Sequence, residues 1–192
     1  MSSRKQKQSM DKVYLYLAFL TLTAIACSEN GQKPGSATPE AFFDLKGYIE
    51  QEVQRLSESQ PAVLKRIAID GQKEERAFDS LDYSKELNIF SRSDINKVAW
   101  LDKYRADSTF QDGQLSRISY TSKEKGLKTQ LLELQFSGGR VSRVHIQNKT
   151  ESIVADVAQE MWYDPEHGYS LESRQSTALT KEKKVKVEVD FK

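Results

Sequence analysis

The chain of 192 residues is poor in several residue types, and each shortage excludes a class of protein. Its single cysteine cannot close an intramolecular disulfide or build a thiolate metal site. With 9 glycines and 4 prolines, the sequence is neither collagen-like nor of low complexity. The 29 basic and 28 acidic residues leave a net charge of +1, without the positive excess typical of nucleic-acid-binding proteins. We therefore expect an ordinary folded domain with no nucleic-acid partner.

Catalytic motifs are missing as well. The sequence contains no Gly-x-Ser-x-Gly, no phosphate-binding glycine-rich loop and no His-Glu-x-x-His. Of the two histidines, His145 alternates with apolar neighbours and is expected to be a solvent-facing strand residue. His167 lies in a polar turn at 164–168, for which the alternative is a small metal or acid–base site. The sequence therefore predicts a protein that is not an enzyme and needs no metal or cofactor.

The N-terminal segment has the layout of an export signal. Residues 1–12 hold four basic residues and one acidic residue, and residues 13–28 hold no charge. An apolar stretch this short falls below the roughly 20 residues that a membrane-spanning helix needs. A positive segment, a short apolar segment and small residues at its end are typical of a secretory signal. The alternative is an N-terminal anchor that is never cleaved.

The only cysteine stands where that apolar segment ends. The run Leu22-Thr23-Ala24-Ile25-Ala26-Cys27 resembles the lipobox of bacterial lipoproteins. The resemblance implies that Cys27 receives a diacylglyceryl group, that signal peptidase II cleaves before it, and that a fatty acid such as palmitate acylates the new amino group. Two or more acyl chains anchor a protein stably in a membrane. The implied peptidase recognition residues are Leu22, Ala24, Ile25 and Ala26, although the family usually has leucine at the position of Ala24.

The rest of the sequence is similar to small lipoproteins of the Bacteroidota cell envelope, which have a lipobox, a short tether and a charged domain. Two short runs, Asp79-Ser80-Leu81 and Asp107-Ser108-Thr109, resemble the O-glycosylation motif of exported proteins in that phylum. Ser28 follows the cysteine, instead of the aspartate that retains enterobacterial lipoproteins in the inner membrane. The resemblance therefore implies a lipid anchor in the outer membrane, with the domain facing the periplasm or the cell exterior.

These observations divide the chain into three parts. We predict a signal peptide over residues 1–26, the lipidated cysteine with a flexible tether over 27–37, and a single domain over 38–192. Once residues 1–26 are removed, 25 basic and 27 acidic residues remain of the original 29 and 28, and the net charge becomes −2. No excess of one sign points to an acidic or basic partner.

The domain begins with a helical pattern. Thr38-Pro39-Glu40 combines an N-cap hydroxyl, a proline at the first helical position and an acidic residue in the first turn. Apolar residues then recur three or four positions apart, at Phe42, Leu45, Ile49, Val53 and Leu56. This spacing predicts an amphipathic helix of about 20 residues. A second, shorter helix is predicted after Asp82, with Tyr83, Leu87 and Phe90 on its apolar face.

Strands account for most of the remainder. Asp70-Gly71 predicts a hairpin turn between strands 63–69 and 72–78. From residue 98 onwards, extended segments alternate with short turns, which favours antiparallel neighbours; we expect strands at 98–108, 115–122, 127–136, 141–148, 153–163, 169–178 and 185–191. The predicted class is α+β, with the N-terminal amphipathic helix packed on a curved antiparallel β-meander of about seven to nine strands.

Two groups of side chains have more than one interpretation. The C-terminal lysines are expected on a solvated strand edge, where they oppose edge-to-edge pairing, and the alternative is contact with anionic lipid headgroups: Lys181, Lys183, Lys184 and Lys186. Several aromatic residues are expected in the core, and the alternative is that they line a cavity for a hydrophobic ligand: Phe42, Phe43, Trp100, Trp162 and Tyr163.

The sequence therefore predicts a lipid-anchored cell-envelope protein, and it identifies no specific activity. Our leading hypothesis is a non-enzymatic binding or structural module, attached to the membrane through Cys27 and contacting another envelope protein. The alternative is a periplasmic carrier or chaperone for a lipid or other hydrophobic ligand, with the long helix as a lid over the sheet.

Overall fold

The computed structural model describes residues 42–177 and 181–192. The chain divides after Ala37 into two units, and everything described below belongs to the second. The predicted signal peptide, the lipobox-like residues Leu22, Ala24, Ile25 and Ala26, and the predicted lipidation site Cys27 lie outside the described residues. None of the helices in the described part of the chain is long and apolar enough to cross a membrane.

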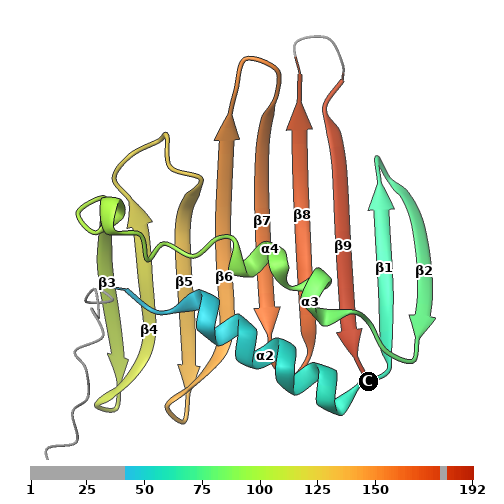
Figure 1. Ribbon diagram of the computed structural model, residues 1–192, viewed down its shortest axis with the longest axis horizontal. Coiled ribbons are helices and arrows are strands. Elements are labelled where there is room, and N and C mark those ends of the chain that lie inside the picture. The colour runs from blue at the N-terminus through green and yellow to red at the C-terminus, as the bar shows by residue number, and fades with distance from the viewer. Residues whose placement is uncertain (1–41, 178–180) are drawn as a thin grey trace, which may run out of the picture. The chain divides into compact units, whose positions relative to one another are not determined.

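Most of the domain is one antiparallel sheet of nine strands, in the order β2-β1-β9-β8-β7-β6-β5-β4-β3 (Figure 1). The sheet is open, with β2 and β3 at its two edges. It is therefore antiparallel, as predicted, and the domain is richer in sheet than the predicted α+β class. The strands are β1 (Val63–Ile69), β2 (Gln72–Phe78), β3 (Tyr104–Gln111), β4 (Gln114–Ser122), β5 (Thr129–Ser137), β6 (Arg140–Glu151), β7 (Asp156–Asp164), β8 (Gly168–Ser176) and β9 (Lys183–Phe191).

The strand order follows from two local rules and one long-range pairing. Strands β3 to β9 form a meander in which each strand pairs with the next. Strands β1 and β2 form the predicted hairpin, whose turn residues Asp70 and Gly71 both have positive φ, at 49° and 91°. The hairpin joins the meander because β1 pairs with the last strand, β9. Residues 79–103 then run across one face of the sheet from β2 to β3 (Figure 1).

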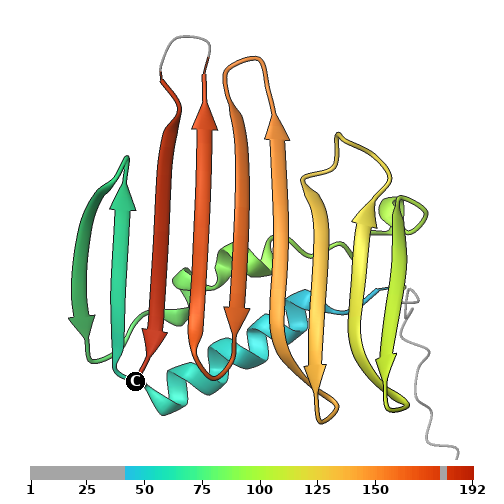
Figure 2. The same cartoon turned by 180° about the vertical axis from the view of Figure 1, so that it is seen from behind.

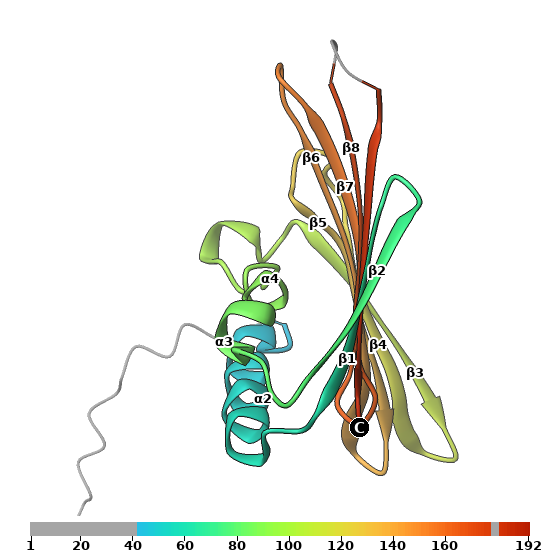
Figure 3. The same cartoon turned by 90° about the vertical axis from the view of Figure 1, so that its right-hand side faces the viewer.

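The helices of the described residues lie together on one side of the sheet (Figure 3). Helix α2 spans Leu45–Ser59, and Asp44 caps it by accepting a hydrogen bond from the backbone N–H of Gly47 at 2.8 Å. It is shorter than predicted, because Phe42 precedes it and the cap is Asp44 instead of Thr38. The predicted second helix forms two short turns, α3 (Tyr83–Glu86), capped by Asp82, and α4 (Asn88–Ser91).

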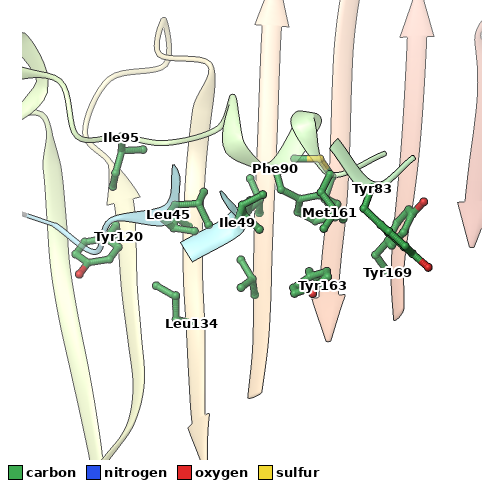
Figure 4. Close-up of a cluster of buried hydrophobic side chains, with 14 of the residues drawn as sticks. Leu45, Ile49, Tyr83, Phe90, Ile95, Tyr120, Leu134, Met161, Tyr163 and Tyr169 are labelled. Carbon is green, nitrogen blue, oxygen red and sulfur yellow. The ribbon is translucent and has the colours of Figure 1, made fainter. Parts of the chain in front are cut away.

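The core lies between these helices and the sheet. Leu45 and Ile49 of α2 and Phe90 of α4 point at the sheet and are at most 1% exposed (Figure 4). Met161 and Tyr163 of β7 meet them and are fully buried. Several aromatic side chains pack edge to face in this layer; for example, the ring centroids of Phe90 and Tyr163 lie 5.9 Å apart.

Two local predictions are wrong. Residues 98–100 form the 3₁₀ turn η1 (Val98–Trp100), so the strand predicted from 98 begins only at Tyr104. Lys183, Lys184 and Lys186 do not lie on a sheet edge, because they belong to β9, an interior strand between β1 and β8, whereas Lys181 precedes β9 and is exposed. Lys186 instead forms ion pairs with Glu188 at 2.8 Å and Glu172 at 3.5 Å.

Candidate functional site

The face of the sheet opposite the helices is the candidate site, and we call it the open face (Figure 2). Because side chains alternate along a strand, the pairing register assigns one row across the centre of this face: Ser119, Glu133, His145, Trp162, Ser170 and Glu188. Ion pairs join neighbouring strands on this face, at Arg66–Glu75, Arg66–Asp190, Arg117–Glu133, His145–Glu160 and Lys186–Glu172. The open face is thus charged but close to balanced.

An aromatic pair lies at its centre. The rings of His145 and Trp162 stack with centroids 3.5 Å apart and planes 1° from parallel. His145 Nε2 also lies 3.0 Å from a carboxylate oxygen of Glu160. These contacts leave His145 only 8% exposed, so the prediction of a solvent-facing histidine is wrong, although the side chain does belong to the face without helices. The prediction that Trp162 belongs to the core is also wrong, because Trp162 lies on the open face beside His145.

A groove of about 500 Å³ runs beside Trp162, across β7, β8 and β9. His145 covers one side of the Trp162 ring, and the register places Ser170 of β8 on the other side. Two residues before Ser170 on β8, the next position on the open face is Gly168, which pairs with Asp164 of β7 and Asp190 of β9. Two small residues in succession on β8 thus leave a trough between the side chains of β7 and those of β9.

Gly168 cannot be replaced without moving a strand. Its φ is +131°, a conformation that residues with a side chain rarely adopt. A Cβ atom built there would lie 1.9 Å from the carbonyl oxygen of Val189 on β9. Glycine is therefore required both by the backbone conformation and by the close approach of β8 and β9 at the bottom of the trough.

The lower end of the groove is formed by the β7–β8 turn. Asp164 accepts hydrogen bonds from the backbone N–H groups of Glu166 and His167, and its carboxylate lies 2.9 Å from Nδ1 of His167. Arg143 of β6 lies 3.8 Å from the same carboxylate. Burial alone raises the pKa of Asp164, but the hydrogen bonds from the turn outweigh it and lower that pKa. The hydrogen bond and charge of Asp164 raise the pKa of exposed His167.

A second, smaller groove of about 360 Å³ continues along the same strands. Its lining includes Glu160 and Glu172, which lie two positions beyond Trp162 and Ser170 on β7 and β8. Two residues along a strand span about 7 Å. The two grooves therefore follow one another along the open face.

The helix face carries a different polar arrangement, which joins the two layers. Tyr163 of β7 donates a hydrogen bond to Glu52 of α2 at 2.5 Å, and Arg55 pairs with the same carboxylate at 2.6 Å. Burial raises the pKa of Tyr163, and the Glu52 carboxylate raises it further, so the phenol stays a donor. Arg55 also donates to the carbonyl oxygen of Pro165 in the β7–β8 turn.

A matching set lies on the neighbouring strand, where Tyr169 of β8 pairs in register with Tyr163. Tyr169 of β8 donates a hydrogen bond to Glu86 of α3, and Lys65 of β1 pairs with that carboxylate at 2.7 Å. In both sets a tyrosine of the sheet holds a helical glutamate whose charge a cation balances. These hydrogen-bonded sets connect the helical segments to the sheet.

The residues that sequence analysis singled out are thus distributed over both faces. Of the two histidines, His145 stacks on Trp162, and His167 lines the same groove as Trp162. Of the expected core aromatics, Tyr163 is fully buried and Phe42 packs edge to face on Tyr104 and Tyr120. Sequence analysis did not identify Gly168 and Ser170, which form the floor of the groove. Their spacing could have indicated it, because two small residues two positions apart on a strand lie on the same face.

Among residues 42–177 and 181–192, no group of three or more His, Cys, Asp or Glu is arranged to hold a metal ion. A comparison of the chain with protein-family models, with curated proteins and with solved structures finds no match to any of them.

Proposed function

We propose that this protein is a lipid-anchored module of the bacterial cell envelope that binds another envelope component through the open face, without catalysing a reaction. The observation that supports the proposal is the contrast between the two faces of one sheet. The helix face is filled by side chains such as Leu45 and Ile49, which are at most 1% exposed. The open face instead presents grooves, cross-strand ion pairs and an aromatic pair.

The packing between the layers favours this proposal over a carrier for a hydrophobic ligand. A carrier needs an apolar cavity of about 300 Å³ or more. In the described part of the chain, Met161, Tyr163 and Phe90 belong to the same cluster of buried side chains as Leu45 and Ile49 of α2, and the rings of Phe90 and Tyr163 meet edge to face. The tyrosine–glutamate pairs also hold the helical segments against the sheet, which opposes the opening of a lid.

The anchor is tested by metabolic labelling with an alkyne analogue of palmitate in a bacterial host. The wild-type chain is expected to incorporate the label and to sediment with membranes. Cys27→Ser is expected to remain an unlabelled precursor with its signal peptide attached, and Ser28→Ala serves as the neighbouring control that still incorporates label. A Cys27→Ser chain that matures to the same mass as the Ser28→Ala control would refute the lipoprotein assignment.

The binding face is tested by site-specific photocross-linking in intact cells. A photoreactive residue replaces either Gln147, exposed on the open face, or Gln51, exposed on α2. We expect position 147 to cross-link to one envelope component, identified by mass spectrometry, and position 51 not to do so. Equal cross-linking from both positions, or none from position 147, would contradict the proposed role of the open face.

A further inference from the structure

The groove beside Trp162 has the dimensions of a slot for a single ring. Its side chains come from β7 on one side and β9 on the other, whose backbones lie two strand spacings apart, roughly 10 Å. Between them, Gly168 and Ser170 contribute almost no side-chain volume. One flat side of the slot is aromatic, because Trp162 stands against Ser170 there. A ring-shaped ligand that enters this slot stacks on the indole.

The rest of the slot is lined by groups that form hydrogen bonds. Asp164, Glu188 and Asp190 supply carboxylate oxygens, which accept hydrogen bonds but do not donate them. Arg143 supplies donors at the same groove. The ligand that suits this lining has an apolar flat side and a rim that both donates and accepts.

The charges of the slot distinguish between cationic, anionic and neutral ligands. Each carboxylate of the slot already faces a cation: Asp190 lies 2.7 Å from Arg66, Glu188 lies 2.8 Å from Lys186, and Asp164 contacts His167 and Arg143. The charges of the slot are therefore balanced, and they favour neither a cationic nor an anionic ligand. A neutral polyol matches this balance.

We propose that this groove is a saccharide-binding site in which one pyranose ring stacks on Trp162 and directs its hydroxyl groups to Asp164, Glu188, Asp190 and Arg143. The second groove, along β7 and β8, lies where the next sugar unit of an oligosaccharide would follow. The inference rests on the proposed function as a binding module and gives it a ligand class, but it does not depend on the lipid anchor.

The test uses the full chain, purified in a detergent whose headgroup is not a sugar. Trp100 is replaced by phenylalanine so that Trp162 is the only fluorescent indole. The probes are soluble tetrasaccharides built from glucose, galactose, mannose or N-acetylglucosamine, with tetramethylammonium as the cationic comparison. Tryptophan fluorescence measures binding, and saturation-transfer NMR identifies which protons of the sugar lie on the ring.

Three variants locate the site. Ser170→Leu fills the trough, and Trp162→Ala, followed by NMR alone, removes the stacking surface; each is expected to weaken binding about tenfold or more. Ser119→Leu is the matched control, since Ser119 is also a half-buried serine in mid-strand on the open face, but lies outside the groove. It is expected to bind like the parent chain. Equal urea midpoints for the serine variants confirm that the fold is retained.

The outcomes are decisive in both directions. Saturable binding of at least one tetrasaccharide, lost in Ser170→Leu and kept in Ser119→Leu, supports the proposal. Binding that survives Ser170→Leu, binding of tetramethylammonium alone, or binding of no probe overturns it. If cross-linking from position 147 still captures an envelope component in the last case, the binding module stands and only the saccharide assignment fails.

Discussion

Gly168 is the residue at which a single methyl group should have the largest local effect, and Gly168→Ala tests the account of the groove floor. The substitution adds only a Cβ atom. At this position that atom meets the backbone of Val189 at 1.9 Å, where a real Cβ atom does not approach. Because the contact is with backbone and not with the end of a flexible side chain, relief requires β8 and β9 to separate near their paired ends.

Two contributions set the magnitude. A residue with a side chain held at a φ of +131° costs about 1–3 kcal/mol of conformational strain. Forcing an extra methyl group into a closely packed position costs about 1–3 kcal/mol more. We therefore expect the free energy of unfolding to fall by about 2–6 kcal/mol, a large part of the stability of a typical domain. Gly139→Ala is the matched control, because its φ is also positive, at +75°, but a Cβ atom there meets nothing within 4 Å.

Urea unfolding of the full chain, followed by circular dichroism, measures both variants. We expect Gly139→Ala to lose only about 1–2 kcal/mol, the usual cost of a left-handed conformation. The difference between the two variants isolates the contact with β9. If Gly168→Ala unfolds within about 0.5 kcal/mol of Gly139→Ala, the close approach of β8 and β9 is not what makes glycine necessary there.

Three further predictions concern the core, the contact between the layers and the β7–β8 turn. Ile49→Ala removes a side chain that is 1% exposed and should cost about 2–5 kcal/mol in urea unfolding, whereas exposed Gln51→Ala should stay within about 0.5 kcal/mol; equal losses would argue against burial of α2. Tyr163→Phe removes the 2.5 Å hydrogen bond to Glu52 and should cost about 1–3 kcal/mol in the same assay, and an unchanged midpoint would show that the bond contributes nothing. NMR titration should place the pKa of His167 above 6.5, and Asp164→Asn should return it towards 6.5. Because the folded pKa is the raised one, the stability from this pair is complete below pH 6.5 and is lost as the pH rises through the folded pKa; a pKa at or below 6.5 in the parent chain would refute the pairing.

Local features of the fold could be predicted from the sequence because their causes are local. Asp70-Gly71 predicts the β1–β2 hairpin, since both residues tolerate the positive φ that a two-residue turn requires. The alternation from Val185 to Phe191 predicts β9, because a strand with one buried face repeats every two residues. The start of α2 was misplaced because Thr38 and Asp44 are both good caps, and periodicity alone does not choose between them.

The candidate site was harder to predict, because its parts come from different strands. His145 was expected in solvent, since its neighbours along the chain are apolar; its burial comes from Trp162, which reaches it only through the β6–β7 register. The lysines of β9 were predicted on an edge because lysine there opposes edge-to-edge pairing, but the pairing with β1 places β9 inside the sheet.

The sequence by itself determined most of the strands, the β1–β2 hairpin and the amphipathic pattern of α2, as well as the resemblance of the N-terminal segment to a lipoprotein signal. These depend on spacings of two to four residues and on turn chemistry, which a single chain displays directly. Only the tertiary structure decided that β1 pairs with β9 and that the described helices gather on one face. It also decided that Ser170 lies between Trp162 and Glu188, and Gly168 between Asp164 and Asp190. Those relations join residues that are adjacent across strands and distant along the chain, and only the pairing register of the sheet fixes them.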